Sequence, residues 1–123
     1  MNSYERLEAW QAAHRLVLLI YHTTRGFPPE ERFGLVSQLR RAAFAVAANI
    51  VEGSAKKGPR EFRRFLDIAV GSVAELRYTL RLVKDLNLVS EEAFQDLEAV
   101  RDQIGRLTWG LYTSMRRAIA RTE

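Results

Sequence analysis

One apolar pattern in the second half of the chain constrains the fold more than any other feature. Seven apolar residues alternate spacings of four and three positions without a break: Phe62, Leu66, Ala69, Val73, Leu76, Leu80 and Val83. This heptad pattern predicts a long helix whose apolar seam packs in a bundle or a coiled coil. Pro59 suits its first position, because the N–H that proline lacks would have no partner there. Asn87-Leu88-Val89 is expected to end the helix.

Two helices are predicted before this one. The first spans about residues 3–24 and ends at Gly26-Phe27-Pro28-Pro29, because each proline forces its predecessor out of the helical region. Its predicted inner stripe is Leu7, Trp10, His14, Val17, Tyr21 and Thr24. The second starts near Glu30, with acids in its first turn, and ends near Gly53. Its predicted inner face is Leu35, Leu39, Ala42, Val46, Asn49, Ile50 and Gly53.

A fourth helix is predicted to follow Ser90, which serves as its N-cap before two acids in the first turn. Its predicted inner face is Leu97, Val100, Ile104, Leu107, Leu111, Met115 and Ala118. Four helices joined by short loops predict an all-α, antiparallel up-down-up-down four-helix bundle. At 123 residues, the chain is expected to form one domain over residues 1–123.

Composition excludes several classes of site. The chain has no cysteine, so it offers no disulfide, thiolate metal site or thiol nucleophile. Its N-terminal segment carries acids and lacks the apolar core of a signal peptide. The longest apolar run covers residues 16–21, which is far too short to span a membrane. We therefore expect a cytoplasmic protein with no membrane partner.

Positive charge is concentrated in residues 40–64. This stretch carries a net charge of +5, whereas the whole chain sums to +4. In an antiparallel bundle the turn after the second helix lies at the same end as both termini, so basic residues near the C-terminus join it. We predict that this basic end binds nucleic-acid phosphates, because clustered cations gain affinity by releasing counterions. The predicted contacts are Arg40, Arg41, Lys56, Lys57, Arg60, Arg63, Arg64, Arg116 and Arg117. A solvated charged face is the alternative interpretation.

Small residues and aromatics on the outer faces of the last two helices indicate a subunit interface. Gly71, Ala74 and Tyr78 lie opposite the heptad seam, and Trp109 and Tyr112 lie away from the inner face of the fourth helix. Trp and Tyr are enriched where subunits meet. We therefore expect a homo-oligomer, with isolated surface aromatics as the alternative.

Polar residues on the two central helices are predicted to form a buried hydrogen-bonded network of Asn49, Glu52, Ser72 and Glu75. A di-metal bundle would need Glu-x-x-His pairs, which the chain lacks. His14 is expected to be a hydrogen-bonded core residue. Arg15 and His22 match the loose Arg-x(4–6)-His pattern of the ribonuclease domains called HEPN, which leaves a nuclease as a third hypothesis. We expect no catalytic residue, metal or cofactor.

Four motifs carry a resemblance to a known family. They are F-P-x-E-E (Phe27, Pro28, Glu30, Glu31), G-L-x-x-Q-x-R-R-A (Gly34, Leu35, Gln38, Arg40, Arg41, Ala42), N-I-x-E-G (Asn49, Ile50, Glu52, Gly53) and E-F-x-R-F-L (Glu61, Phe62, Arg64, Phe65, Leu66). Ser72, Glu75 and Leu76 follow them. The chain resembles, from Leu7 to about Met115, the four-helix bundle proteins encoded within intervening sequences of bacterial 23S ribosomal RNA genes.

The resemblance implies a small homo-oligomer, a pentamer, with a basic surface that binds nucleic acid. A similar bundle is the accessory protein of diversity-generating retroelements, which partners a reverse transcriptase. Our main hypothesis is therefore a non-enzymatic oligomeric bundle that binds structured RNA or DNA. The alternative hypothesis is a scaffold that docks a partner protein such as a reverse transcriptase.

Overall fold

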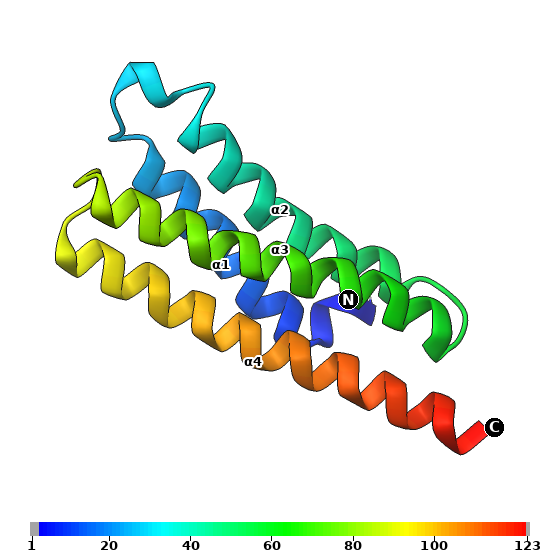
Figure 1. Cartoon of the computed structure of the whole chain (residues 1–123). Coiled ribbons are helices and arrows are strands. Elements are labelled where there is room, and N and C mark those ends of the chain that lie inside the picture. The colour runs from blue at the N-terminus through cyan, green and yellow to red at the C-terminus, as the bar shows by residue number, and fades with distance from the viewer. Residues whose placement is uncertain (1–2, 123) are drawn as a thin grey trace.

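Four long helices account for most of the computed structural model, which describes residues 3–122. Short 3-10 turns at Ser3–Arg6 (η1) and Pro29–Glu31 (η2) precede the first two helices. The helices are α1 (Glu8–Thr24), α2 (Leu35–Ser54), α3 (Pro59–Asp85) and α4 (Glu91–Thr122). Consecutive helices run in opposite directions (Figure 1). The predicted antiparallel four-helix bundle is confirmed.

The bundle has two distinct ends. The α2–α3 turn lies at one end together with the start of α1 and the C-terminal turns of α4 (Figure 1). We call this the turn end, and we call the opposite one, with the α1–α2 and α3–α4 connections, the loop end. Around the bundle, α1 contacts α2, α2 contacts α3, α3 contacts α4, and α4 returns to α1. The α1–α2 pair and the α3–α4 pair are therefore on opposite sides of the molecule.

The heptad seam of α3 is buried as predicted. Six of its seven positions, from Leu66 to Val83, are buried, and Phe62 is half-buried against the core. The end of α3 is a Schellman motif, in which Leu88 N–H donates to the Val83 carbonyl and Asn87 N–H donates to the Lys84 carbonyl. Asn87 takes the left-handed conformation with φ of 61° that this motif requires. The sequence therefore predicted the end of α3 correctly.

Caps at the starts of α3 and α4 also match the prediction. Pro59 is the first residue of α3, directly after Gly58, whose φ of 84° suits glycine. The hydroxyl of Ser90 accepts a hydrogen bond from Ala93 N–H at 3.0 Å, so Ser90 is the N-cap of α4. The start of α2 differs from the prediction, because η2 and a turn occupy residues 29–34. There the Glu31 carboxylate accepts from Leu35 N–H at 3.4 Å and satisfies a free donor of α2.

The predicted inner stripe of α1 is wrong by about one residue. The buried face of α1 consists of Ala9, Ala12, Ala13, Leu16, Ile20 and Thr24. Tyr21 and His14 are exposed, so the expected core histidine is a surface residue. Alanines occupy the seam because α2 is also alanine-rich there, and small side chains let two helix backbones approach closely. The larger side chains of α1 then lie at the flanks of the contact.

No helix within residues 3–122 is both long enough and apolar enough to cross a membrane.

Candidate nucleic-acid interface

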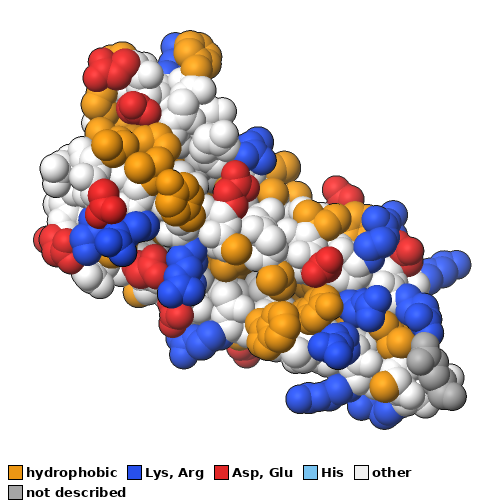
Figure 2. Space-filling model, in the orientation of Figure 1, with side chains coloured by type: hydrophobic (Ala, Val, Ile, Leu, Met, Phe, Trp, Pro, Cys, Tyr) orange, Lys and Arg blue, Asp and Glu red, His pale blue; other side chains and the backbone are white. Residues whose placement is uncertain are grey.

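The α2–α3 turn presents two lysines at the tip of the turn end. Residues 55–58 connect the helices, and Lys56 and Lys57 are exposed there. The turn is short because Gly58 takes a positive φ and Pro59 starts the next helix at once. Lys and Arg side chains gather at this end of the molecule on the face shown in Figure 2.

The first two turns of α3 add three arginines beside these lysines. Arg60 and Arg64 are exposed and Arg63 is half-buried. The Arg64 guanidinium lies 4.6 Å from the ring centre of Phe65, and the Lys56 ammonium lies 5.5 Å from the same ring. Cations held over an aromatic face are attracted by its quadrupole, so the buried Phe65 ring positions both charges. Arg64 also contacts Glu61 at 3.1 Å, which offsets part of the charge.

The last turns of α4 complete the cluster. Arg116 and Arg117 are exposed and line a shallow surface hollow with Thr113 and Ala120. Figure 1 places this part of α4 beside the start of α3, at the same end as the α2–α3 turn. We call the following set the turn-end cluster: Lys56, Lys57, Arg60, Arg63, Arg64, Arg116 and Arg117.

Arg40 and Arg41 do not belong to the turn-end cluster, contrary to our prediction. Arg40 Nε donates to the Thr24 hydroxyl at 2.9 Å, and its guanidinium lies 4.4 Å from the Tyr21 ring centre, towards the loop end. Arg41 contacts Gln38 and pairs with Glu75 at 2.8 Å in the middle of the bundle. A helix rises 1.5 Å per residue, so Arg41 lies about 20 Å along the axis from the α2–α3 turn.

The predicted buried network of Asn49, Glu52, Ser72 and Glu75 is also corrected. Glu52 is exposed, and 40% of the Glu75 side chain is exposed where it pairs with Arg41. Asn49 is half-buried, and its amide donates to the Ala45 carbonyl one turn earlier at 2.7 Å. Ser72 is half-buried. Asn49 is therefore satisfied within its own helix and Glu75 by a surface ion pair, since alanines and leucines fill the space between α2 and α3.

The histidines lie apart from the turn-end cluster. His22 is exposed and lines a hollow between α1 and the start of α4. Arg15 donates to the side-chain carbonyl of Gln103 at 3.3 Å. Within residues 3–122, no three His, Asp or Glu side chains are grouped closely enough to hold a metal ion.

Two apolar surfaces outside the basic end are exposed. Tyr78 is 67% exposed and Trp109 is 52% exposed, and Trp109 stacks on Tyr112 at 5.3 Å. These aromatics and the exposed Gly71 and Ala74 lie on α3 and α4, and they are the residues that the sequence predicts at a subunit interface. Our sequence reasoning missed a second surface, a groove between α1 and α2 lined by Trp10, His14 and Phe44. The aromatic pair at positions 10 and 14, one turn apart, was the available signal.

Comparison with known proteins places the chain in a family. The family model of the 23S rRNA-intervening sequence protein matches residues 5–110. The chain belongs to this family. A crystal structure of a protein of unknown function from the S23 ribosomal protein family of Bacteroides thetaiotaomicron is similar, with a TM-score of 0.78. It shares 19% sequence identity, and the match covers 85% of this chain and 95% of that one. Among curated proteins, none matches the chain significantly.

Proposed function

We propose that this protein is a non-enzymatic, homo-oligomeric bundle that binds structured RNA or DNA through phosphate contacts at its turn end. The observation that carries the proposal is the convergence of cations from separate segments: the α2–α3 turn, the start of α3 and the last turns of α4. A family named for an intervening sequence of ribosomal RNA supports a nucleic acid as the partner. We infer that this binding takes place in the cytoplasm.

The geometry favours binding to phosphates over reading of bases. The cations come from a turn and from the ends of two helices, and not from one continuous helix face that could lie along a groove (Figure 1). Contacts of this kind fix position without specifying sequence. The amides in the first turn of α3 add donors, because its N-cap Gly58 has no side chain to satisfy them. Family resemblance implies that the homo-oligomer is a pentamer.

Salt dependence of binding tests this proposal. Lys56→Gln/Lys57→Gln/Arg117→Gln removes three exposed cations of the turn-end cluster. A control with the same change in net charge, Arg25→Gln/Arg32→Gln/Arg77→Gln, removes three exposed cations from other parts of the bundle. Labelled duplex DNA and hairpin RNA are titrated at several salt concentrations. Each lost phosphate contact should reduce the slope of log K against log salt concentration by roughly 0.7 to 0.9.

We expect the turn-end variant to lose affinity by at least about tenfold at 0.1 M salt, because two or three phosphate contacts disappear. The control should bind like wild type. Absence of wild-type binding at low salt would overturn the proposal, and so would an equal loss of affinity in both variants.

A second function, a scaffold for a partner protein such as a reverse transcriptase, is favoured by the exposed apolar surfaces. A scaffold of this kind would show little binding to nucleic acid and a shallow salt dependence. The same titration therefore distinguishes the two functions.

A further inference from the structure

A small pocket at the loop end is lined by three arginines: Arg25, Arg32 and Arg40. It lies beside the connection between α1 and α2, at the opposite end of the bundle from the turn-end cluster (Figure 1). Its volume is about 200 Å³, and no acidic side chain of the described residues lines it. We call it the arginine pocket. It offers several positive charges and no negative one.

Each arginine of the pocket comes from a different part of the chain. Arg25 follows the last residue of α1, Arg32 follows η2, and Arg40 lies in the second turn of α2. The connection between these elements is stiff, because Pro28 and Pro29 restrict its backbone and Arg32 N–H donates to the Pro29 carbonyl at 3.1 Å. The segments that carry the arginines are therefore held together before any ligand binds, which lowers the entropy cost of binding.

Arg40 is half-buried, and two contacts fix its side chain. Its Nε donates to the Thr24 hydroxyl at 2.9 Å, and its guanidinium lies 4.4 Å from the ring centre of Tyr21. Thr24 is buried, and its hydroxyl donates in turn to the Ile20 carbonyl at 2.7 Å. An arginine carries five N–H donors, and the bond to Thr24 uses only the one on Nε. Within residues 3–122, the Nη donors of Arg40 have no hydrogen-bond partner.

Arg25 and Arg32 are exposed, and neither forms an ion pair within the described part of the chain. The acid nearest to Arg32 in sequence is engaged elsewhere, because the Glu31 carboxylate accepts from the first N–H of α2. On the other side of the loop end, by contrast, Arg81 and Lys84 are both paired with carboxylates. Positive charges that share a pocket without a counter-charge repel one another, so a bound anion would stabilise this arrangement.

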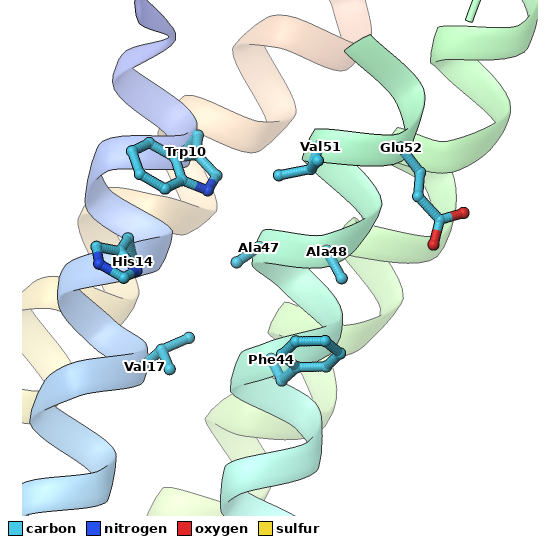
Figure 3. Close-up of a pocket in the computed structure, with 8 residues that line it drawn as sticks. All are labelled: Trp10, His14, Val17, Phe44, Ala47, Ala48, Val51 and Glu52. Atoms are coloured by element: carbon cyan, nitrogen blue, oxygen red, sulfur yellow. The ribbon is translucent and has the colours of Figure 1, made fainter. Parts of the chain in front are cut away.

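The larger groove between α1 and α2 is of a different kind. It has a volume of about 420 Å³, and Figure 3 shows Trp10, Val17 and Phe44 around it. No Lys or Arg of residues 3–122 lines this groove, and Glu52 gives it a negative charge. The positive charge of the arginine pocket is therefore not a general property of the α1–α2 side of the bundle.

We propose that the arginine pocket binds the phosphate monoester group of a small molecule, such as a nucleoside monophosphate or a sugar phosphate. A guanidinium presents two parallel N–H donors that match two oxygens of a phosphate. A monoester has three free oxygens and carries close to two negative charges at neutral pH, so three arginines can pair with it. Phe27 and Pro28 also line the pocket and provide an apolar wall for the rest of the ligand. The pocket is smaller than the roughly 300–1,000 Å³ typical of sites for drug-sized ligands, which favours a small ligand.

The inference does not rest on nucleic-acid binding. A phosphodiester in a duplex backbone has two free oxygens and one negative charge, and a sugar flanks it on each side, so it fits this pocket poorly. The arginine pocket and the turn-end cluster also lie at opposite ends of the bundle (Figure 1). The two sites should therefore bind different ligands and be separable by substitution.

Calorimetric titration without nucleic acid tests the inference. The probes are adenosine 5′-monophosphate, ribose 5-phosphate and inorganic phosphate, with dimethyl phosphate as the diester. We expect wild type to bind one monoester per chain with a Kd below about 1 mM. Dimethyl phosphate should bind at least about tenfold more weakly, because a charge-assisted hydrogen bond is lost. The ratio of the affinities for the two monoesters shows whether the base of a nucleotide contributes.

Two variants with the same change in net charge locate the site. Arg25→Gln/Arg32→Gln removes the exposed cations of the arginine pocket and should lower monoester affinity about a hundredfold, because two charge-assisted hydrogen bonds are lost. Lys56→Gln/Lys57→Gln removes two cations of the turn-end cluster and should bind the monoester like wild type. Arg40→Lys keeps the charge but lacks the planar fork, so its affinity should fall about tenfold. Circular dichroism establishes that each variant is folded.

Several outcomes would overturn the inference. They are a wild type that binds no monoester, equal losses in the two double variants, a diester that binds as tightly as the monoesters, and full affinity in Arg40→Lys. A loss confined to Lys56→Gln/Lys57→Gln would also overturn it, because the phosphate would then lie at the turn end. Arg25→Gln/Arg32→Gln should bind duplex DNA like wild type. Failure of nucleic-acid binding would leave the monoester titration unaffected, so the two proposals fail separately.

Discussion

Gly53 shows how one residue of a family motif is dictated by packing. A Cβ atom at this position would lie 2.8 Å from Cδ1 of Phe62 and 3.0 Å from Cβ of Phe65. The glycine of the N-I-x-E-G motif therefore lets α3 approach α2 at the point where the turn-end cluster begins. The same contact fixes Phe65, whose ring holds the cations of Lys56 and Arg64.

A matched pair of glycine substitutions tests this account. Gly53→Ala should destabilise the fold by about 1–3 kcal/mol, because the added methyl overpacks the α2–α3 contact. Gly110→Ala should stabilise it by about 0.5–1 kcal/mol, because nothing lies within 4 Å of the added atom and alanine favours the helix. Denaturant unfolding at equal protein concentration measures both. A stabilised Gly53→Ala variant would contradict the proposed close approach.

Residue-scale features of the chain were predictable where they depend on neighbours in sequence. Pro59, Asn87 and Ser90 begin or end helices as expected, because caps and turns are governed by local backbone chemistry. The predicted buried network was wrong because it depends on how α2 and α3 are rotated about their own axes, which local sequence does not determine. Asn49 is satisfied by its own helix instead.

At the scale of elements, α4 carries polar residues at positions that the bundle buries. Arg101 is only 8% exposed, and Thr108 is completely buried. The Arg101 guanidinium pairs with Glu98 while its Nε has no partner within the described chain. Gly105 leaves room for it, since a Cβ there would lie 3.5 Å from Nη1 of Arg101. The pair thus occupies the α3–α4 contact.

Removing the two partners of this ion pair should have unequal effects. Glu98→Ala should cost about 2–4 kcal/mol of unfolding free energy, because it leaves a buried guanidinium unpaired. Arg101→Met should stay within about 1 kcal/mol of wild type, since an apolar side chain of similar length replaces the charge. Chemical denaturation of both variants checks this asymmetry. Equal losses would mean that Arg101 has a structural role beyond its pairing with Glu98.

The helix faces were predictable to different degrees. The predicted inner face of α3 was correct because its apolar residues repeat without a break over three heptads. The inner face predicted for α1 was wrong because α1 carries apolar residues around most of its circumference. Alanines, rather than Trp10 and Tyr21, form the buried seam. Where both helices offer small residues, the closest approach decides which face is buried.

At the scale of the whole molecule, the antiparallel connectivity of the helices predicts which cations lie together at the turn end. Closeness in the sequence does not predict it. Lys56 and Arg116 come from distant segments and share the turn end because the bundle is antiparallel. Arg40 and Arg41 are nearer to Lys56 in sequence, yet their positions along α2 carry them away from that end. The loop end mixes both signs of charge, as the ion pairs Arg81–Asp85 and Lys84–Glu91 show.

Each copy in the proposed homo-oligomer carries one turn-end cluster. A nucleic acid longer than one bundle could therefore contact the clusters of several copies at once. Linked sites raise overall affinity by roughly 10² to 10⁴ over a single site. Affinity for a long duplex should therefore depend on residues that never touch it.

Trp109→Glu tests this dependence, because it places a charge on the exposed aromatic surface of α4 that we predict to be a subunit interface and retains every cation of the turn-end cluster. We expect it to bind a 40-base-pair duplex about a hundredfold more weakly than wild type, since each monomer engages with one cluster only. Phe33→Glu makes the same change in net charge at a side chain that is 88% exposed, and it should bind like wild type. Fluorescence anisotropy at fixed salt gives the affinities. Equal binding by Trp109→Glu and Phe33→Glu would mean that each turn end acts alone and that assembly serves another purpose.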